Sequence, residues 1–505
     1  MRAQEVFIEK DLSEVLRTFQ RAIPQGEAYE FELTSLDRLG IPLWGAFVWA
    51  EDGDFSDGFG YGADTLSARV SAWGEVLENY WATRTLAQMP RRRASFNQLK
   101  SENALAADPV SLCLNAGINY SDEREIIWTN GKKHGSNDKC WLPIEAVAIS
   151  PTDIKNDFAA DDFLFNPITN GLGAGASLEQ ALAHGILEQI QRDGDSVTFR
   201  AMDAGVKIEL DEVETEETRE LLKFLDQAGI EVIPKLAGTV CGIPVIYVVG
   251  YDRNLEQSPF HLSLSACGEA AHPNREIALS KALREFVSSR ARKRFMHGSI
   301  DDMKRIAPRK YSERVLADEL GADESRALQS VLEWTQMSRQ NFFELIGLPI
   351  FEVRRNVKFS DLPTVEINQI NTAAKLLDLL TARLKEEKLE IFYADFTPPD
   401  ARFAVVKAVV AGLEVETMSY NRIGLRNFQR LLWRGERDSQ FAGLVGVGNP
   451  PPEALKVYLS EADERAFGGK AWLNPVEIER RVGKLYALYR EPNGHTIGKL
   501  KALQK

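Results

Sequence analysis

The sequence predicts an α/β fold of mixed sheets and helices, and three observations support this prediction. Glycine-rich segments run directly into amphipathic helices at successive places along the chain. Residues 205–265 alternate a helical segment, ETEETRELLKFLDQAG, with the apolar strands EVIPKLAG and IPVIYVVGYD, which is an αβ pattern. Hydrophobic residues make up 44% of the 505 residues, which is enough to build a large core.

The first glycine-rich segment is GFGYG (58–62), which leads into a predicted helix over residues 63–89 with Asp64 or Thr65 near its N-cap. Spacings of three and four residues place a polar set on one face of this helix: Ser71, Glu75 and Glu78. Two carboxylates one turn apart cost a helix about a few tenths of a kcal/mol, so a cation usually compensates. Mg²⁺, which carboxylates and substrate phosphates bind together, is one candidate, and a solvated acidic stripe is the alternative.

The second segment is TNGLGAGAS (169–177), followed by the predicted helix LEQALAHGILEQIQRD (178–193). Ser177 is a good N-cap, and Gln180 completes a capping-box pattern. Glycines let backbone N–H groups approach an anion, and a helix N-terminus favours one, so a nucleotide-phosphate site is the first hypothesis. The glycine spacing fits neither the Rossmann fingerprint nor a Walker A motif, and a tight turn that feeds a surface helix is the alternative.

The polar face of this second helix spans about a third of its circumference. It carries Gln180, His184, Glu188, Gln191 and Arg192. His184 is the only one of the six histidines that we place in the site, because the chain has neither an HExxH motif nor an i, i+4 histidine pair.

The third segment is GEAAHPNR (268–275), which precedes a strongly amphipathic helix predicted over residues 276–295. This helix carries Glu285 and a basic run made of Arg290, Arg292, Lys293 and Arg294. A run of this kind is usually a solvated face, and neutralisation of phosphate is the alternative.

Taken in this order, the three segments resemble the YcaO superfamily over residues 25–415. The family's GKG loop and S-x-x-x-E-x-x-E-R helix are matched by Gly60-Tyr61-Gly62 and by Ser71, Glu75, Glu78 and Asn79. Its N-G-x-x-A-G-N-T loop and E-x-x-E-R motif are matched by residues 170–177 and by Glu188, Gln191 and Arg192. Its A-L-T-E-x-x-x-S-R helix is matched by residues 282–285 and by Ser289 and Arg290.

The resemblance implies a homodimeric protein that uses ATP and Mg²⁺ to phosphorylate a peptide backbone amide oxygen. A nucleophile then attacks the activated carbon: a Cys, Ser or Thr side chain gives an azoline, sulfide gives a thioamide and an amine gives an amidine. The resemblance assigns the metal to Glu75, Glu78 and Glu188. The nucleotide site that it implies comprises Tyr61, Ser71, Glu75, Glu78, Gln180, His184, Glu188, Gln191, Arg192, Glu285 and Arg290.

Five departures from the family pattern bear on the charge and the ligands of the site. A lysine is replaced by Tyr61, an arginine by Asn79, an asparagine by Ala176, and two glutamates by Gln180 and Gln191. The net charge of the site changes little, but its affinity for metal should fall, because a glutamine oxygen is neutral. Two interpretations are open: a divergent enzyme with a reshaped pocket, or a subunit that has lost catalysis.

Composition is that of a cytoplasmic globular enzyme. The formal net charge of −13 argues against broad binding to nucleic acid or to anionic membranes. No run approaches the ~20 apolar residues of a membrane span, and the N-terminus lacks a signal peptide. The four scattered cysteines suggest neither a zinc site nor disulfides, and we interpret Cys267 as a packed core thiol.

For the domain organisation, we predict a YcaO-like domain over residues 1–415 and a C-terminal extension of unknown role over residues 416–505. Residues 1–30 hold a short helix and are too short for a peptide-leader recognition domain. We therefore expect a precursor peptide to arrive with a separate leader-recognition or sulfur-delivery protein. Azoline-forming relatives often end in a proline-rich tail, whereas residues 449–452 precede some fifty more residues, which argues against that subgroup.

The function that fits these observations is ATP-dependent activation of a peptide backbone amide in the biosynthesis of a ribosomal peptide natural product. The alternative is a catalytically degenerate scaffold that binds the peptide or a partner enzyme. Catalysis predicts Mg²⁺-ATP binding and ATP turnover that peptide stimulates, and the scaffold predicts neither.

Overall fold

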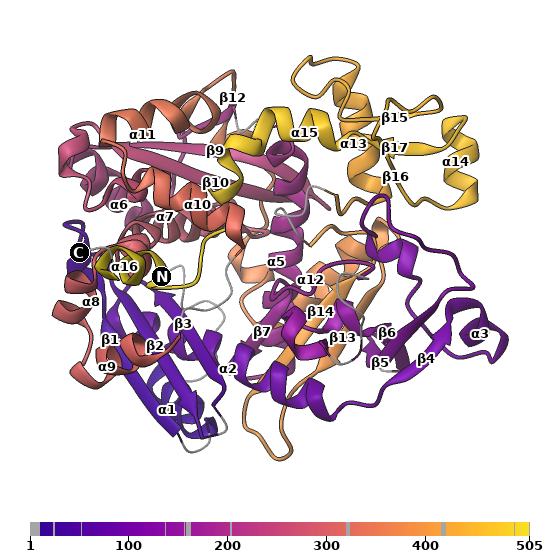
Figure 1. Ribbon diagram of the computed structural model, residues 1–505, viewed down its shortest axis with the longest axis horizontal. Coiled ribbons are helices and arrows are strands. Elements are labelled where there is room, and N and C mark those ends of the chain that lie inside the picture. Colours follow the sequence, from indigo (N-terminus) through magenta and orange to yellow (C-terminus); the bar gives the residue numbers. More distant parts are fainter. Residues whose placement is uncertain are drawn as a thin grey trace.

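Figure 1 shows the computed structural model of the chain. It describes residues 11–503 except 24–25, 52, 137, 156, 158–162, 202–204, 320–323, 416–420 and 489. Within these ranges, the strands form four sheets that helices cover and connect, so the predicted α/β class is confirmed.

The N-terminal sheet is antiparallel in the order β1-β2-β3. Its strands are β1 (Gly26–Glu32), β2 (Leu43–Ala50) and β3 (Phe55–Tyr61). Alternate residues of β2 face opposite sides, as the strand period requires. Ala46 and Val48 pack on the side of α1 (Leu12–Ala22) and α2 (Thr65–Gln88). Phe47 and Trp49 pack against residues of α7 (Arg275–His297), α8 (Ile300–Ile306) and α9 (Arg309–Ala317).

The second sheet is antiparallel in the order β4-β5-β13-β14-β7, and β6 pairs with β5. Its strands are β4 (Arg92–Ser95), β5 (Glu125–Lys133), β6 (Lys139–Pro143), β7 (Leu172–Gly175), β13 (Ile391–Asp395) and β14 (Ala404–Val410). The long helix α5 (Leu178–Phe199) packs on β7 and β14, and α12 (Ala373–Glu386) packs on α5. Two short helices flank the strands at one end of the sheet, α3 (Phe96–Ser101) and α4 (Ile144–Val147).

The third sheet has the order β11-β10-β9-β8-β12, in which only the β8–β12 pair is parallel among the described strands. Its strands are β8 (Val206–Glu209), β9 (Ile230–Val240), β10 (Ile243–Asp252), β11 (Cys267–Ala271) and β12 (Arg355–Lys358). The αβ pattern predicted for residues 205–265 is confirmed by α6 (Glu216–Gln227) and the two strands after it. The helix α7 packs against β11 and β10.

The remaining elements are mostly short. The described part of residues 300–385 is largely helical, and the further helices there are α10 (Ser325–Trp334) and α11 (Arg339–Ile346), with a π-helical turn over Gly347–Phe351. The last part of the chain holds a small sheet in the order β15-β17-β16. Its elements are α13 (Leu425–Gly435), β15 (Val445–Val447), β16 (Leu455–Lys456), α14 (Glu461–Phe467), β17 (Ala471–Leu473), α15 (Pro475–Val482) and α16 (Thr496–Leu503).

The C-terminal residues share a hydrophobic core with the residues before 416. Leu431, Leu473 and Ile497 belong to the same buried cluster as Ile190 and Val406. The helix α15 ends at Val482, and a 3-10 turn, Gly483–Leu488, follows it. Within the described residues, none of the helices combines the length and the apolar character that crossing a membrane requires.

Three glycine-rich strands lie directly against the helices that follow them. A Cβ added at Gly60 of β3 would overlap the carbonyl oxygen of Ala68 in α2. The same overlap occurs between Gly173 and Ala181, and between Gly268 and Ala282. The strand backbone therefore touches the helix backbone in each of the three units, and only glycine allows this approach.

We predict that Gly60→Ala lowers the free energy of unfolding by about 1–3 kcal/mol, because the added methyl group forces two packed backbones apart. Urea denaturation followed by circular dichroism measures the change. Gly347→Ala is the control, because no atom lies within 4 Å of its added Cβ. Equal losses in the two variants would contradict this account of the strand–helix contact.

Candidate active site

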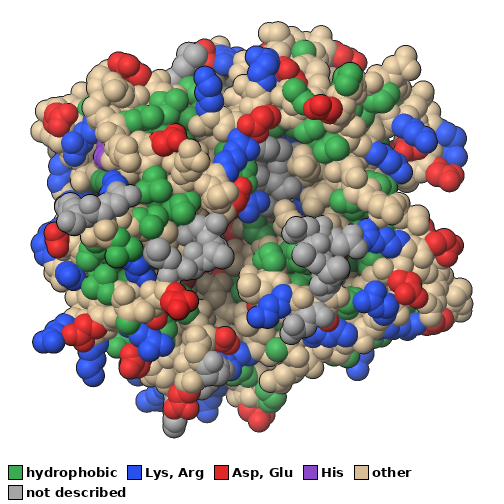
Figure 2. Space-filling view, in the orientation of Figure 1, with side chains coloured by type: hydrophobic (Ala, Val, Ile, Leu, Met, Phe, Trp, Pro, Cys, Tyr) green, Lys and Arg blue, Asp and Glu red, His purple; other side chains and the backbone are tan. Residues whose placement is uncertain are grey.

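A cavity of about 810 Å³ lies where α2, α5 and α7 approach one another. Figure 2 shows a hollow near the centre of this face, between β3 and β7 of Figure 1. Nearly all the residues predicted for the nucleotide site line this cavity: Tyr61, Ser71, Glu75, Glu78, Gln180, His184, Glu188, Gln191, Arg192 and Glu285.

Each of the three helices presents a glutamate that accepts a hydrogen bond from a backbone N–H of the strand before it or of the residue that directly precedes that strand. The N–H of Phe59 donates to Glu75 (2.6 Å). The loop N–H of Gly171, just before β7, donates to Glu188 (2.8 Å). The N–H of Glu269 donates to Glu285 (3.3 Å). One strand–helix unit thus recurs three times around the cavity, and in each case the strand fixes a carboxylate of the following helix.

Two further backbone N–H groups, one in β7 and one just after it, also bind side chains of the cavity. Ala174 donates to Glu78 Oε1 (2.7 Å), and Ala176 donates to Gln180 Oε1 (2.9 Å). Four N–H groups of the first two glycine-rich segments thus bind side chains in this structure: Phe59, Gly171, Ala174 and Ala176. Phosphate binding by these segments stays a prediction. The predicted N-cap residues Asp64 and Ser177 do cap their helices. Asp64 forms a capping box with Ser67, and the side chain of Ser177 accepts a hydrogen bond from the N–H of Gln180.

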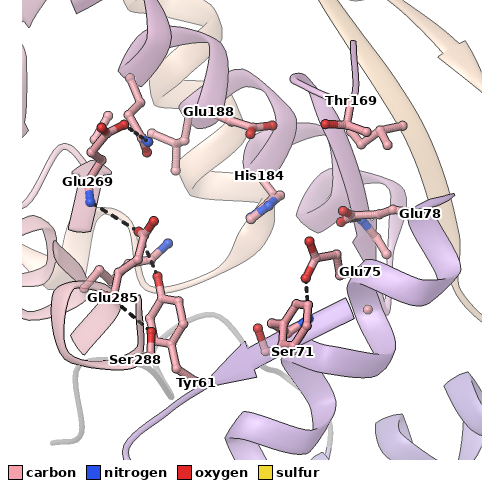
Figure 3. Close-up of a pocket in the computed structure, with 18 of the residues that line it drawn as sticks. Tyr61, Ser71, Glu75, Glu78, Thr169, His184, Glu188, Glu269, Glu285 and Ser288 are labelled. Atoms are coloured by element: carbon pink, nitrogen blue, oxygen red, sulfur yellow. Dashed lines mark hydrogen bonds between the residues drawn. The ribbon is translucent and has the colours of Figure 1, made fainter. Parts of the chain in front are cut away.

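The predicted metal ligands face one cavity. Figure 3 shows Glu75 and Glu78 of α2 directed toward the space that Glu188 and His184 of α5 also border. Enclosure in the cavity raises the pKa of Glu75 to about 7. Burial, followed by repulsion from Glu75 and Glu188, raises the pKa of Glu78 to about 8. Carboxylates that repel one another away from bulk water form a site for a cation.

These acids do not enclose an ion by themselves. Across the part of the chain that the structure describes, no three His, Cys, Asp or Glu side chains are clustered closely enough to hold a metal. Mg²⁺ usually takes one or two carboxylates and completes its shell with water and phosphate oxygens. Glu75, Glu78 and Glu188 fit that mode of binding, in which a nucleotide supplies the remaining ligands.

Tyr61, which stands where the resemblance expects a lysine, is directed toward α7. Its hydroxyl donates to Glu285 Oε2 (3.2 Å), as Figure 3 shows. Burial and the neighbouring Glu285 raise the pKa of Tyr61, so the hydroxyl stays protonated and remains a donor. Burial and repulsion from Glu269 raise the pKa of Glu285 to about 7.

Positive charge reaches the cavity mainly from α7. Arg192 of α5 is joined there by Lys281, Arg292 and Lys293. Burial lowers the pKa of Lys281, and the nearby Glu285 and Glu188 offset part of that effect. The sequence motifs do not single out Lys281, although its spacing of four residues from Glu285 puts both on one helix face. Burial and the charge of Lys281 lower the pKa of His184 to about 4, so this imidazole is neutral at pH 7.

Arg290 is a correction to the predicted site. Its guanidinium is fully buried and binds Asp37 (2.6 Å) and Asp252 (2.9 Å), and it does not line the cavity. Residues two apart lie about 200° apart around a helix, so Arg290 and Arg292 point to different sides of α7. Arg290 joins α7 to β10, and Arg292 faces the cavity.

Three more cavity residues were not assigned by the sequence: Glu269, Cys267 and Glu491. Cys267 is half-buried and packs against the main hydrophobic core, as predicted, but it also lines the cavity, and burial raises the pKa of its thiol. Glu491 lies in the C-terminal part of the chain and pairs with Lys293, Arg292 (3.6 Å) and His297 (3.1 Å). The region predicted as an extension of unknown role therefore supplies part of the cavity wall.

Comparison with known proteins identifies the family. The family model described as YcaO cyclodehydratase, ATP- and Mg²⁺-binding, matches residues 59–414, which is more than half of the chain. The chain belongs to the YcaO family. Proteins of this family depend on ATP and Mg²⁺, and membership supports ATP-dependent peptide modification as the general class of activity. The matched range includes every cavity residue on α2, α5 and α7.

Two relatives cover most of this YcaO chain. A protein of Methanothermobacter thermautotrophicus, described as uncharacterized, is 27% identical over 417 residues, which cover 82% of this chain and 97% of that protein. An uncharacterized protein in the tfuA 3′ region of Rhizobium leguminosarum bv. trifolii is 25% identical over 402 residues, which cover 78% of this chain and 85% of that protein.

Solved YcaO-type structures share the fold. YcaO from Methanopyrus kandleri, bound with AMPPCP and Mg²⁺, superposes with a TM-score of 0.54 at 20% identity, covering 82% of this chain and 94% of that chain. A heterocyclase in complex with substrate and cofactor gives a TM-score of 0.56 at 17% identity, covering 80% of this chain and 52% of that chain. At these identities the likeness concerns the fold alone.

We predict that the metal-free protein loses stability through Glu78 as the pH rises from about 5 to 8. The pKa of Glu78 is about 8 in the folded protein, whereas the unfolded chain has the ordinary glutamate pKa of 4.5, so ionisation of Glu78 favours unfolding in this window. Glutamine does not titrate at this position. The difference in free energy of unfolding between Glu78→Gln and wild type should therefore shift in favour of the variant by more than about 1 kcal/mol when the pH rises from 5 to 8.5.

Urea denaturation in EDTA at each pH makes this comparison. Glu123→Gln, at an exposed position outside the cavity, is the control and should follow wild type. Parallel pH curves for wild type and Glu78→Gln would show that Glu78 keeps an ordinary affinity for its proton in the folded protein.

Proposed function

We propose that this YcaO protein binds Mg²⁺-ATP in the cavity and activates a backbone amide of a precursor peptide for attack by a nucleophile. The observation that supports this most is the convergence of Glu75, Glu78 and Glu188 from two helices on one cavity inside the matched family range. Each carboxylate is fixed by a backbone N–H, so the acids are preorganised before any ligand binds.

The acidic and the basic residues of the cavity would have different roles. Glu75, Glu78 and Glu188 would hold Mg²⁺, and Arg192 and Lys281 would balance the charge of the phosphates. When bound, Mg²⁺-ATP supplies the phosphoryl group that turns a poor leaving group, the amide oxygen, into a good one. Neutral His184 can accept or donate a hydrogen bond without adding charge. Tyr61 holds Glu285 in place as a donor.

The nucleophile decides the product, and we favour one that a partner delivers. The Cys267 thiol in the cavity wall keeps its proton because burial raises its pKa, so it offers no thiolate. A sulfur-delivery partner, which gives a thioamide, is our first candidate, and azoline or amidine formation are the others. A separate leader-recognition protein and a homodimeric assembly complete the proposal.

A scaffold function is the second candidate, and one observation favours it. The positions where the resemblance expects charged groups are occupied by neutral side chains with structural partners: Gln180 binds Ala176, Gln191 binds Glu269, and Asn79 binds the Asp57 carbonyl. A protein that binds a peptide or a partner enzyme does not need those charges.

We predict that Glu75→Gln weakens Mg²⁺-dependent ATP binding at least about tenfold, or about 1.4 kcal/mol, because a neutral amide replaces a carboxylate ligand. Isothermal titration calorimetry with ATP and Mg²⁺ measures this change. ATP turnover that the peptide stimulates should be abolished. Glu123→Gln is the control for a charge lost outside the cavity. Unchanged binding in Glu75→Gln would remove this residue from the metal site.

We predict that Gln180→Glu/Gln191→Glu binds Mg²⁺-ATP more tightly than wild type, because two carboxylates are restored at the cavity wall. The same calorimetry compares the two proteins. Tight wild-type binding that the double change leaves unaltered would show that the glutamines do not weaken the metal site. Absence of binding in both proteins would favour the scaffold.

A further inference from the structure

Glu269 of β11 contacts the two residues that end the polar face of α5. Its Oε2 accepts hydrogen bonds from Arg192 Nη1 (2.7 Å) and from Gln191 Nε2 (3.2 Å). The residue is only 8% exposed, and a carboxylate removed from water to this extent requires a cationic partner. Arg192 is that partner. Position 269 lies in the segment GEAAHPNR (268–275), but it is not among the motif positions from which the site was predicted.

Arg192 has a second carboxylate within reach, which is the predicted metal ligand Glu188. The distance between Arg192 Nη2 and Glu188 Oε1 is 3.7 Å, whereas Arg192 Nη1 and Glu269 Oε2 are 2.7 Å apart. A charge-assisted hydrogen bond is strong at about 2.7–2.9 Å. The guanidinium is therefore bonded to Glu269, and its interaction with Glu188 is a longer-range attraction.

Asp195 is a third acid near Arg192, and it is a weaker partner for the guanidinium than Glu269. Asp195 lies one turn after Arg192 on α5 and is fully buried. Burial and repulsion from Glu269 raise the pKa of Asp195 well above its ordinary value, which weakens Asp195 as a charged partner for Arg192. Glu269 is thus the carboxylate that sets the direction of Arg192.

We propose that Glu269 is a positioning residue of the nucleotide site: it draws Arg192 away from Glu188 and leaves the Glu188 carboxylate available to a cation. This inference rests on the proposed function, because that cation is the Mg²⁺ of Mg²⁺-ATP. It also accounts for glutamine at position 191. The carboxylate at this place in the cavity wall is that of Glu269 in β11, so position 191 does not have to supply one. The amide of Gln191 instead donates a hydrogen bond to Glu269.

The test is Glu269→Gln, titrated with Mg²⁺ at fixed ATP by calorimetry. Once its charged partner is lost, Arg192 should turn to Glu188 and compete with the metal, so the apparent affinity for Mg²⁺ should fall at least about tenfold. Glu276→Gln is the matched control, because Glu276 has the same 8% exposure and binds backbone N–H groups outside the cavity. It should behave as wild type.

Two double variants separate positioning from a general loss of structure. Gln191→Glu in the Glu269→Gln background returns a carboxylate to the same place and should restore the affinity. This variant also serves if Glu269→Gln alone fails to fold. In the Arg192→Gln background, Glu269→Gln should have no further effect, because no guanidinium is left to compete for Glu188.

The outcomes distinguish this inference from the function on which it rests. Wild type that binds no Mg²⁺-ATP overturns both. Wild type that binds, together with an unchanged Glu269→Gln, overturns only the positioning role. An equal loss with and without Arg192, or a folded Gln191→Glu/Glu269→Gln protein that stays weak, shows that Glu269 acts on the metal site by another route and also overturns it.

Discussion

The hydrogen bond from a backbone N–H in or just before a strand to a glutamate of the next helix is the interaction on which this site depends. It occurs at Phe59–Glu75, Gly171–Glu188 and Glu269–Glu285, once in each strand–helix unit. The bond forms because glycines let each strand lie directly against its helix. A hydrogen bond to a charged group contributes about 1.5–3 kcal/mol, which helps to offset the removal of a carboxylate from water.

These hydrogen bonds offset only part of the cost of removing the carboxylates from water, and the part that is not offset shows as raised pKa values. The raised pKa values of Glu75, Glu78 and Glu285 mean that the empty cavity favours their protonated forms. A divalent cation reverses that preference, so metal binding and proton release are linked. The protein sacrifices stability at this cavity in order to hold acids ready for a ligand, as functional sites commonly do.

Much of this architecture was predictable from the sequence, because glycine-rich strands and amphipathic helices have local signals. The faces of α2 and α5 were predicted from spacing alone. Arg290 was assigned wrongly, because a basic run on a helix contributes residues to more than one side and only packing decides which of them meets Asp37. Glu269 and Glu491 were missed, since a short strand and a C-terminal loop carry no periodicity that points to a distant cavity.

The measurement that tests the central claim most directly is a crystal structure with a non-hydrolysable ATP analogue and Mn²⁺ in place of Mg²⁺, with the metal located by its anomalous scattering. The account predicts an anomalous peak within ligand distance of carboxylate oxygens from both α2 and α5, among Glu75, Glu78 and Glu188, with the phosphates beside Arg192 or Lys281. A metal and nucleotide bound elsewhere, or a cavity that remains empty at saturating nucleotide, would contradict it.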